Sequence, residues 1–181
     1  MRGTKLLSIA VGASITAGLL APAVADEFTD SLASMRRAMV GHWSGKISGT
    51  DGSGNEFDVD DDFTFVVTSE DGLDSATWSS ETLEIATYET DGRYRVRWWN
   101  RTGGQGGVEY RLRIVEGPDE QGNGAWVQEL EQTGPEGTVM GAREHFRLSG
   151  DALRMEIEVR PAGSEEPFET TVVGNWSRVS N

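Results

Sequence analysis

The stretch Asp91-Gly-Arg-Tyr-Arg-Val-Arg-Trp-Trp-Asn100 joins a tight-turn signal to a strict alternation of polar and apolar residues. An Asp-Gly pair before such a run is typical of a β-hairpin, because both residues tolerate the positive φ angles of the turn. Tyr94, Val96 and Trp98 then share one face of the strand, and three arginines share the other. After a Gly-rich segment, the run from Val108 to Ile114 alternates in the same way. This stretch therefore predicts two antiparallel strands with one apolar face.

The same period of two extends through most of the chain, with turns rich in Gly, Asp, Asn and Ser between the runs. In the runs at 76–80 and 83–87 we take Trp78, Leu83 and Ile85 as the apolar face. Successive alternating strands with short turns favour an up-and-down antiparallel meander, and closure removes its exposed edges. We predict an all-β barrel of about eight to ten strands. The runs lie at 43–47, 57–67, 76–80, 83–87, 94–98, 108–114, 126–130, 144–148, 153–159 and 168–176.

One helical pattern precedes the strands. Leu32, Met35 and Met39 fall at positions i, i+3 and i+7, which places them on one helix face. A polar residue at 29–31 can cap the start, and Gly41 can end the helix. We therefore expect a short helix over residues 29–40 that covers one end of the barrel.

The N-terminus has the three parts of an export signal. Arg2 and Lys5 form a basic start, Leu6–Leu20 is an apolar run, and Ala23-Val24-Ala25 is a small-residue cleavage site before Asp26. The apolar run is short for a membrane span, and no later run approaches the roughly 20 residues needed. We expect cleavage after Ala25 and a periplasmic or secreted bacterial protein.

Charge and cysteine content limit the possible partners of the predicted single domain at 26–181. The full chain has 16 Lys and Arg against 30 Asp and Glu, and loss of the signal lowers its net charge from −14 to −16. So acidic a protein repels nucleic acid. The chain has no Cys, so its stability depends on a hydrophobic core rather than on disulfides.

The two ends of the predicted sheet carry a family resemblance. Gly41-His42-Trp43 follows the helix directly, and Trp176-Ser177-Arg178 ends the last strand. This arrangement resembles the calycin superfamily, in which a G-x-W opens the first strand and an Arg from the last strand packs over the Trp. The resemblance assigns these structural roles to Gly41, Trp43 and Arg178. Because the lipocalin disulfide and long C-terminal helix are missing, the chain is more similar to small bacterial lipocalin-like domains.

The inward face of the predicted barrel holds a set of aromatic and polar residues suited to binding a small ligand. Simple packing of the barrel interior explains the aromatic members nearly as well. The predicted ligand-binding residues are Tyr94, Trp98, Tyr110, Trp126, Gln128 and Glu144.

Glu144 and His145 are the two weak candidates for catalysis. If Ser149–Ala152 forms a hairpin loop, Leu148 faces Leu153 on the inner side, which also holds Glu144. An inward carboxylate can contact a ligand or act as a general acid or base with a raised pKa, or it can lie in water at the strand end. The same register places His145 on the outer face opposite Glu156.

Two charged runs have alternative readings. Asp58, Asp60, Asp61 and Asp62 form a dense acidic run without EF-hand spacing, which favours a bent, solvated strand over a Ca²⁺ site. Arginines at 93, 95, 97, 111 and 113 share one face of two strands, and Glu84, Glu89 and Glu129 are available as partners on an outer wall. If the faces are inverted, these arginines line the interior and the ligand is an anion.

We expect an exported barrel that binds a small apolar or amphipathic molecule, with no metal and no cofactor, because recognised nucleophile, zinc and phosphate-binding motifs are missing. A barrel enzyme of isomerase or cyclase type, using Glu144 or His145, is one alternative. A protein-binding inhibitor or interaction module is the other.

Overall fold

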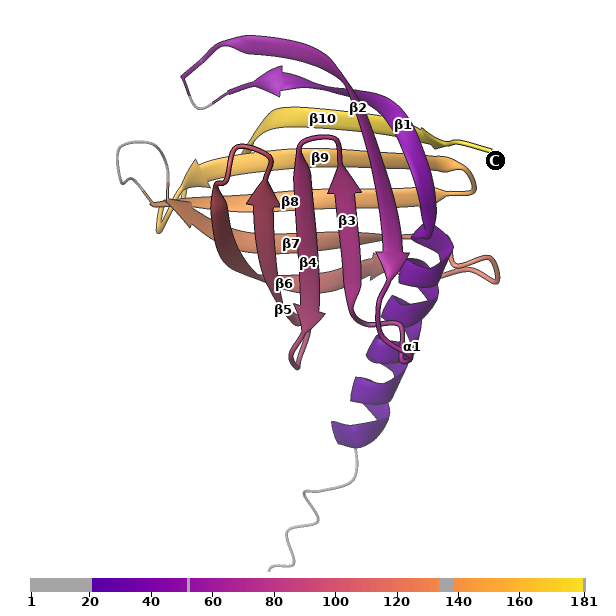
Figure 1. Cartoon of the computed structure of the whole chain (residues 1–181). Coiled ribbons are helices and arrows are strands. Elements are labelled where there is room, and N and C mark those ends of the chain that lie inside the picture. The colour runs from indigo at the N-terminus through magenta and orange to yellow at the C-terminus, as the bar shows by residue number, and fades with distance from the viewer. Residues whose placement is uncertain (1–20, 52, 134–138, 181) are drawn as a thin grey trace, which may run out of the picture.

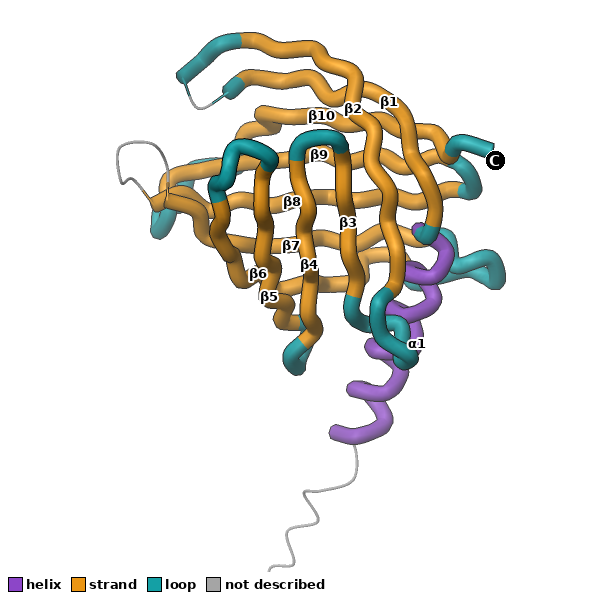
Figure 2. Tube along the Cα trace, viewed as in Figure 1, coloured by secondary structure: helices purple, strands orange, loops and turns teal. Residues whose placement is uncertain are grey.

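A computed structural model describes residues 21–51, 53–133 and 139–180, so residues 1–20 of the predicted signal peptide at 1–25 lie outside this range. One helix precedes a continuous series of strands (Figures 1 and 2). The elements are α1 (Ala21–Met39), β1 (Gly41–Thr50), β2 (Glu56–Val67), β3 (Ser75–Ser79), β4 (Thr82–Tyr88), β5 (Arg93–Asn100), β6 (Gln105–Glu116), β7 (Gly124–Thr133), β8 (Val139–Ser149), β9 (Ala152–Pro161) and β10 (Glu169–Arg178).

The strands form a closed antiparallel barrel in which each strand pairs with its neighbours in sequence. Closure comes from β1, which pairs with β2 on one side and with β10 on the other. The fold class predicted from the alternation, an all-β up-and-down barrel with a helix at its start, is confirmed. The predicted hairpin of β8 and β9 is also confirmed, since Leu148 pairs with Leu153 and His145 with Glu156.

Helix α1 already includes Ala21, the first described residue, so it extends beyond the predicted start at Thr29 and no residue at 29–31 caps it. The predicted face is correct, because Leu32, Met35 and Met39 are buried. The second half of the helix packs against the barrel next to the start of β1 (Figure 1). No helix in the described part of the chain is long and apolar enough to cross a membrane.

Strands β3 and β4 present the opposite faces from those predicted. Trp78, Leu83 and Ile85 are exposed on the outside of the barrel, whereas Glu84 and Ala86 face the interior. Pairing with β5 explains the inversion. Directly opposite residues share a face, and Glu84 pairs with the inward Trp98. Glu84 is therefore not a partner for the outer arginines.

The acidic run on β2 stays in register with β1, because pairing continues without a shift from Gly41 to Thr50. The run therefore contains no bulge and no shift of register. Asp58, Asp60 and Asp62 are exposed, and Lys46 lies 3.4 Å from Asp58. Asp61 instead faces the interior and accepts a 2.9 Å hydrogen bond from Nε1 of Trp176.

Gly41 is a residue that the closure of the barrel requires. Its φ angle is 150°, and a Cβ added there would lie 2.8 Å from Nη1 of Arg178. Trp43 pairs with Arg178 across the β1–β10 seam. The Trp43 side chain is fully buried and donates a 2.9 Å hydrogen bond from Nε1 to the Met39 carbonyl at the end of α1. This corner ties the helix to both ends of the sheet.

Candidate functional site

The interior of the barrel holds a cavity of about 490 Å³, which lies within the size range of small-molecule sites. Arg36 and Met39 of α1 line its floor, and Ser79 and Thr82 line it beside the β3–β4 turn. Arg36 bonds to Ser75 at the start of β3. Because a strand rises about 3.3 Å per residue, the cavity extends roughly 13 Å along β3 from Ser75 to Ser79.

Apolar and aromatic side chains make most of the lining. Trp98 lies flat against the wall where the neighbouring strand has Gly106, and a Cβ at that position would lie 2.5 Å from its indole. Phe63 and Trp176 meet edge to face with ring centroids 5.5 Å apart. Such rings supply contact area for an apolar ligand. The apolar lining residues are Met39, Ile47, Phe63, Phe65, Ala86, Val96, Trp98, Val108, Leu130, Phe146, Leu153, Met155 and Trp176.

A smaller set of polar groups reaches the same space. Gln128 donates a 2.9 Å hydrogen bond from Nε2 to Oε2 of Glu144, which pairs with it across β7 and β8. Burial raises the pKa of Glu144, and the nearby carboxylate of Glu84 raises it further, although the Gln128 hydrogen bond opposes both effects. Glu84 keeps contact with solvent, but the surrounding wall still raises its pKa. Both groups therefore favour the neutral form more than an exposed glutamate does.

Arg36 is a buried cation at the cavity floor, with 6% of its surface exposed. It donates to the Ser75 hydroxyl, and its guanidinium carbon lies 4.3 Å from the centroid of the Tyr94 ring. Burial raises the pKa of Tyr110 to about 12 even though Arg36 lowers it. Tyr110 therefore enters the cavity as a neutral hydroxyl that can donate a hydrogen bond.

Four of the six predicted ligand-binding residues line the cavity, namely Trp98, Tyr110, Gln128 and Glu144. The other two, Tyr94 and Trp126, are buried in the core and are not among its lining residues. Tyr94 stacks on Tyr110 and donates a 3.0 Å hydrogen bond to the Leu73 carbonyl. Trp126 stacks nearly parallel on Phe146, with centroids 5.2 Å apart.

The other charged candidates lie on the outer wall. His145 faces outward, and its Nε2 lies 3.0 Å from Oε2 of Glu158. Of the predicted acidic partners, Glu89 pairs with Arg95, and Glu129 pairs with Arg143. Among the described residues, no group of three or more His, Asp or Glu is arranged to hold a metal ion.

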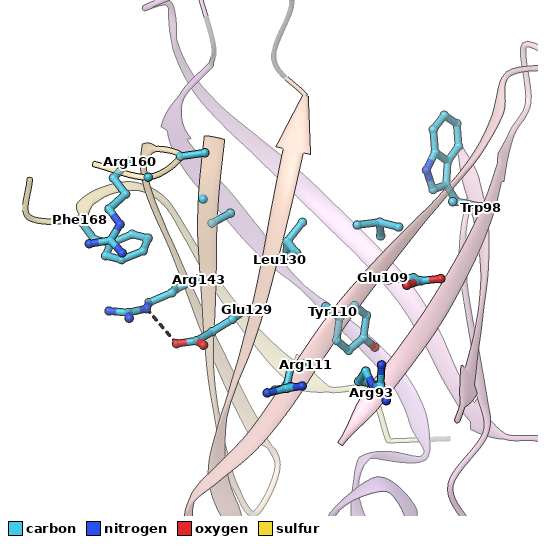
Figure 3. Close-up of a pocket in the computed structure, with 16 residues that line it drawn as sticks. Arg93, Trp98, Glu109, Tyr110, Arg111, Glu129, Leu130, Arg143, Arg160 and Phe168 are labelled. Atoms are coloured by element: carbon cyan, nitrogen blue, oxygen red, sulfur yellow. Dashed lines mark hydrogen bonds and ion pairs between the residues drawn. The ribbon is translucent and has the colours of Figure 1, made fainter. Parts of the chain in front are cut away.

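The barrel wall has a hollow of about 1190 Å³ between β6 and β7 (Figure 3). In the described part of the chain, pairing of these strands begins at Tyr110 and Leu130, so β6 runs from Gln105 to Glu109 without β7 beside it. Tyr110 and Leu130 line both the hollow and the cavity, as do Trp98 and Val108. The hollow is therefore a side opening next to the cavity.

Sequence reasoning missed Arg36, Ser75, Thr77 and Glu84, all of which line the cavity. Arg36 follows Leu32 by four residues, so the period of the helix already placed it on the buried face. The Asp91-Gly92 turn fixes the register that puts Glu84 beside Trp98. Both signals were present in the sequence.

The sequence matches no protein-family model and no curated protein. Among solved structures, the crystal structure of Rv2717c from M. tuberculosis is similar, with a TM-score of 0.50 and 12% sequence identity. The match covers 81% of this chain and 98% of that chain. At this identity the similarity supports the barrel fold alone.

Proposed function

We propose that this protein binds one small, partly apolar molecule inside its barrel, outside the cytoplasm. The observation that carries the proposal is the cavity of about 490 Å³, which combines an aromatic wall with the hydrogen-bonded pair of Gln128 and Glu144. A few fixed polar groups in an apolar cavity are typical of sites that orient a ligand. The calycin-like corner of Gly41, Trp43 and Arg178 supports the same class of protein, and the signal-like N-terminus supports export.

Binding of straight-chain probes tests the proposal. Decanol and decanoate, each below its micelle-forming concentration, should change the tryptophan fluorescence and raise the melting temperature, since a ligand that binds only the folded state stabilises it. Trp98→Ala should weaken binding at least about tenfold, because a buried aromatic contact is lost. Trp99→Ala is the matched control, since Trp99 lies on the outer face of the same strand.

Absence of any response to neutral, anionic or cationic probes would overturn the proposal. An equal loss of binding in Trp98→Ala and Trp99→Ala would also contradict a site inside the barrel. Native mass spectrometry of protein taken from its source supplies an independent readout, because a ligand that co-purifies adds its mass to the folded chain.

A barrel enzyme is the second candidate, and the raised pKa of Glu144 inside the cavity favours it. Glu144 then acts as a general acid or base, with Tyr110 as a neutral hydrogen-bond donor. Glu144→Gln should abolish turnover of a ligand that still binds. If the natural ligand is recovered unchanged after incubation with the protein, the binding function stands alone.

A further inference from the structure

We propose that the ligand is an amphipathic anion, whose anionic group is held by arginines at the side opening between β6 and β7 while its apolar body lies in the cavity. This inference rests on the proposed binding function and adds the ligand class and its orientation. The arginines are Arg93, Arg111, Arg143 and Arg160, and all four line the opening (Figure 3).

Arg93 and Arg111 carry the strongest part of the argument. They are directly opposite each other on β5 and β6, and both are exposed. Like charges in such a cross-strand pair destabilise a sheet. Neither forms an ion pair with a described carboxylate. The two glutamates that line the opening pair with other arginines, Glu109 with Arg95 and Glu129 with Arg143. A bound anion between Arg93 and Arg111 would relieve their repulsion.

Phe168 fixes the other side of the opening. Its ring lies between two guanidiniums, with Arg143 at 4.1 Å and Arg160 at 4.3 Å from the centroid. Cation–π stacking on both faces holds these side chains in place, and of the two only Arg143 also has a described carboxylate partner, Glu129. Arg160 donates to the Glu166 carbonyl and forms no ion pair with a described carboxylate. The opening therefore has a net positive charge on a protein of net charge −14.

The cavity itself disfavours an anion. Asp61, Glu84 and Glu144 give it three carboxyl groups against one guanidinium, that of Arg36 at the floor. The opening, where four arginines face Glu109 and Glu129, is therefore more favourable for an anionic group than the interior. The four residues that border both spaces give an apolar path from the opening to the cavity. This charge distribution orients an amphipathic anion with its apolar end inward.

Matched probes of equal chain length test the inference. Decanoate and monodecyl phosphate should each bind at least about tenfold more tightly than decanol, and decylamine should bind more weakly, because a charge-assisted contact to arginine favours the anion. The ratio between decanoate and monodecyl phosphate distinguishes a carboxylate ligand from a phosphate ligand.

Arg93→Gln combined with Arg111→Gln should reduce the preference for decanoate over decanol to about one. Decanol binding should be unchanged, which shows that the cavity is intact. Arg113→Gln is the control, because Arg113 is an exposed arginine of β6 that does not line the opening. Equal binding of decanoate and decanol to the wild type, or an equal effect of Arg113→Gln, would overturn the inference. If no probe binds at all, the proposed function fails instead.

Discussion

The guanidinium carbon of Arg178 lies 4.4 Å from the centroid of the Trp43 ring, so the last strand of the barrel covers the first. The same guanidinium donates to the carbonyls of Ala38, at 2.6 Å, and Val40, and its Nε lies 3.1 Å from Asp151. Arg178 therefore caps the end of α1 and closes the seam between β1 and β10. Trp43, which is fully buried, is the surface on which it rests.

A double-mutant cycle measures this coupling. Trp43→Ala should reduce the free energy of unfolding by roughly 3–5 kcal/mol because it removes a buried aromatic ring. Arg178→Ala should cost about 1–3 kcal/mol through unpaired carbonyls. In urea unfolding the double mutant should lose less than the sum, by about 1 kcal/mol. Strictly additive losses would contradict a shared unit, and Trp43→Ala with Arg113→Ala supplies an additive reference.

The inverted faces of β3 and β4 give a second prediction. Leu83 is 40% exposed on the outer face of β4, whereas Leu112 is 4% exposed on the inner face of β6. Leu83→Ala should change the free energy of unfolding by about 1 kcal/mol at most. Leu112→Ala should cost about 2–5 kcal/mol, because it leaves a cavity in the core. Equal losses by chemical denaturation would mean that Leu83 is buried.

Alternation predicted the barrel because most strands have one clearly apolar face. The β8–β9 hairpin was predicted residue by residue, since the Ser149–Ala152 loop permits one register that buries both Leu148 and Leu153. In β3 the inner face carries only Ser and Thr, and in β3 and β4 the larger apolar side chains lie on the outer face, so hydrophobicity alone chose the wrong face. The register imposed by β5 decides it instead.

The candidate site was predicted less completely than the fold. The alternation of inward and outward positions along each strand predicted that four residues face the interior, namely Trp98, Tyr110, Gln128 and Glu144. Alternation does not distinguish residues that line the cavity from residues packed in the core, such as Trp126. Arg36 was missed because a charged residue on a helix is ordinarily read as exposed. Its burial depends on the partners that Ser75 and Tyr94 provide from the sheet.

The third prediction concerns export and rests on the sequence alone. Protein recovered outside the cytoplasm should begin at Asp26, and Ala25→Arg should block processing because the cleavage site needs a small residue. The measurement is N-terminal sequencing. Cleavage there would shorten α1 but keep its buried residues from Leu32 onward, so a chain starting at Asp26 should fold. A mature chain that still contains Leu6–Leu20 would contradict this prediction.

The fourth prediction concerns pH and the glutamate inside the cavity. Burial raises the pKa of Glu144 above its ordinary value of 4.5. A raised pKa in the folded state stabilises the protein fully below the unfolded pKa, and this contribution is lost as the pH rises through the folded pKa. Glu144→Gln should therefore increase the free energy of unfolding at neutral pH and have little effect below about pH 4.5.

The gain at neutral pH should be about 1.4 kcal/mol for each unit by which the folded pKa exceeds the unfolded one. Gln at position 144 can still accept the hydrogen bond from Gln128, so the substitution removes the charge and keeps the contact. Urea unfolding of both proteins across this pH range is the measurement. Glu169→Gln, at an exposed position on β10, should leave the pH dependence unchanged. A loss of stability in Glu144→Gln at neutral pH would mean that the ionised carboxylate is favoured in the folded barrel, and that a cation compensates it there.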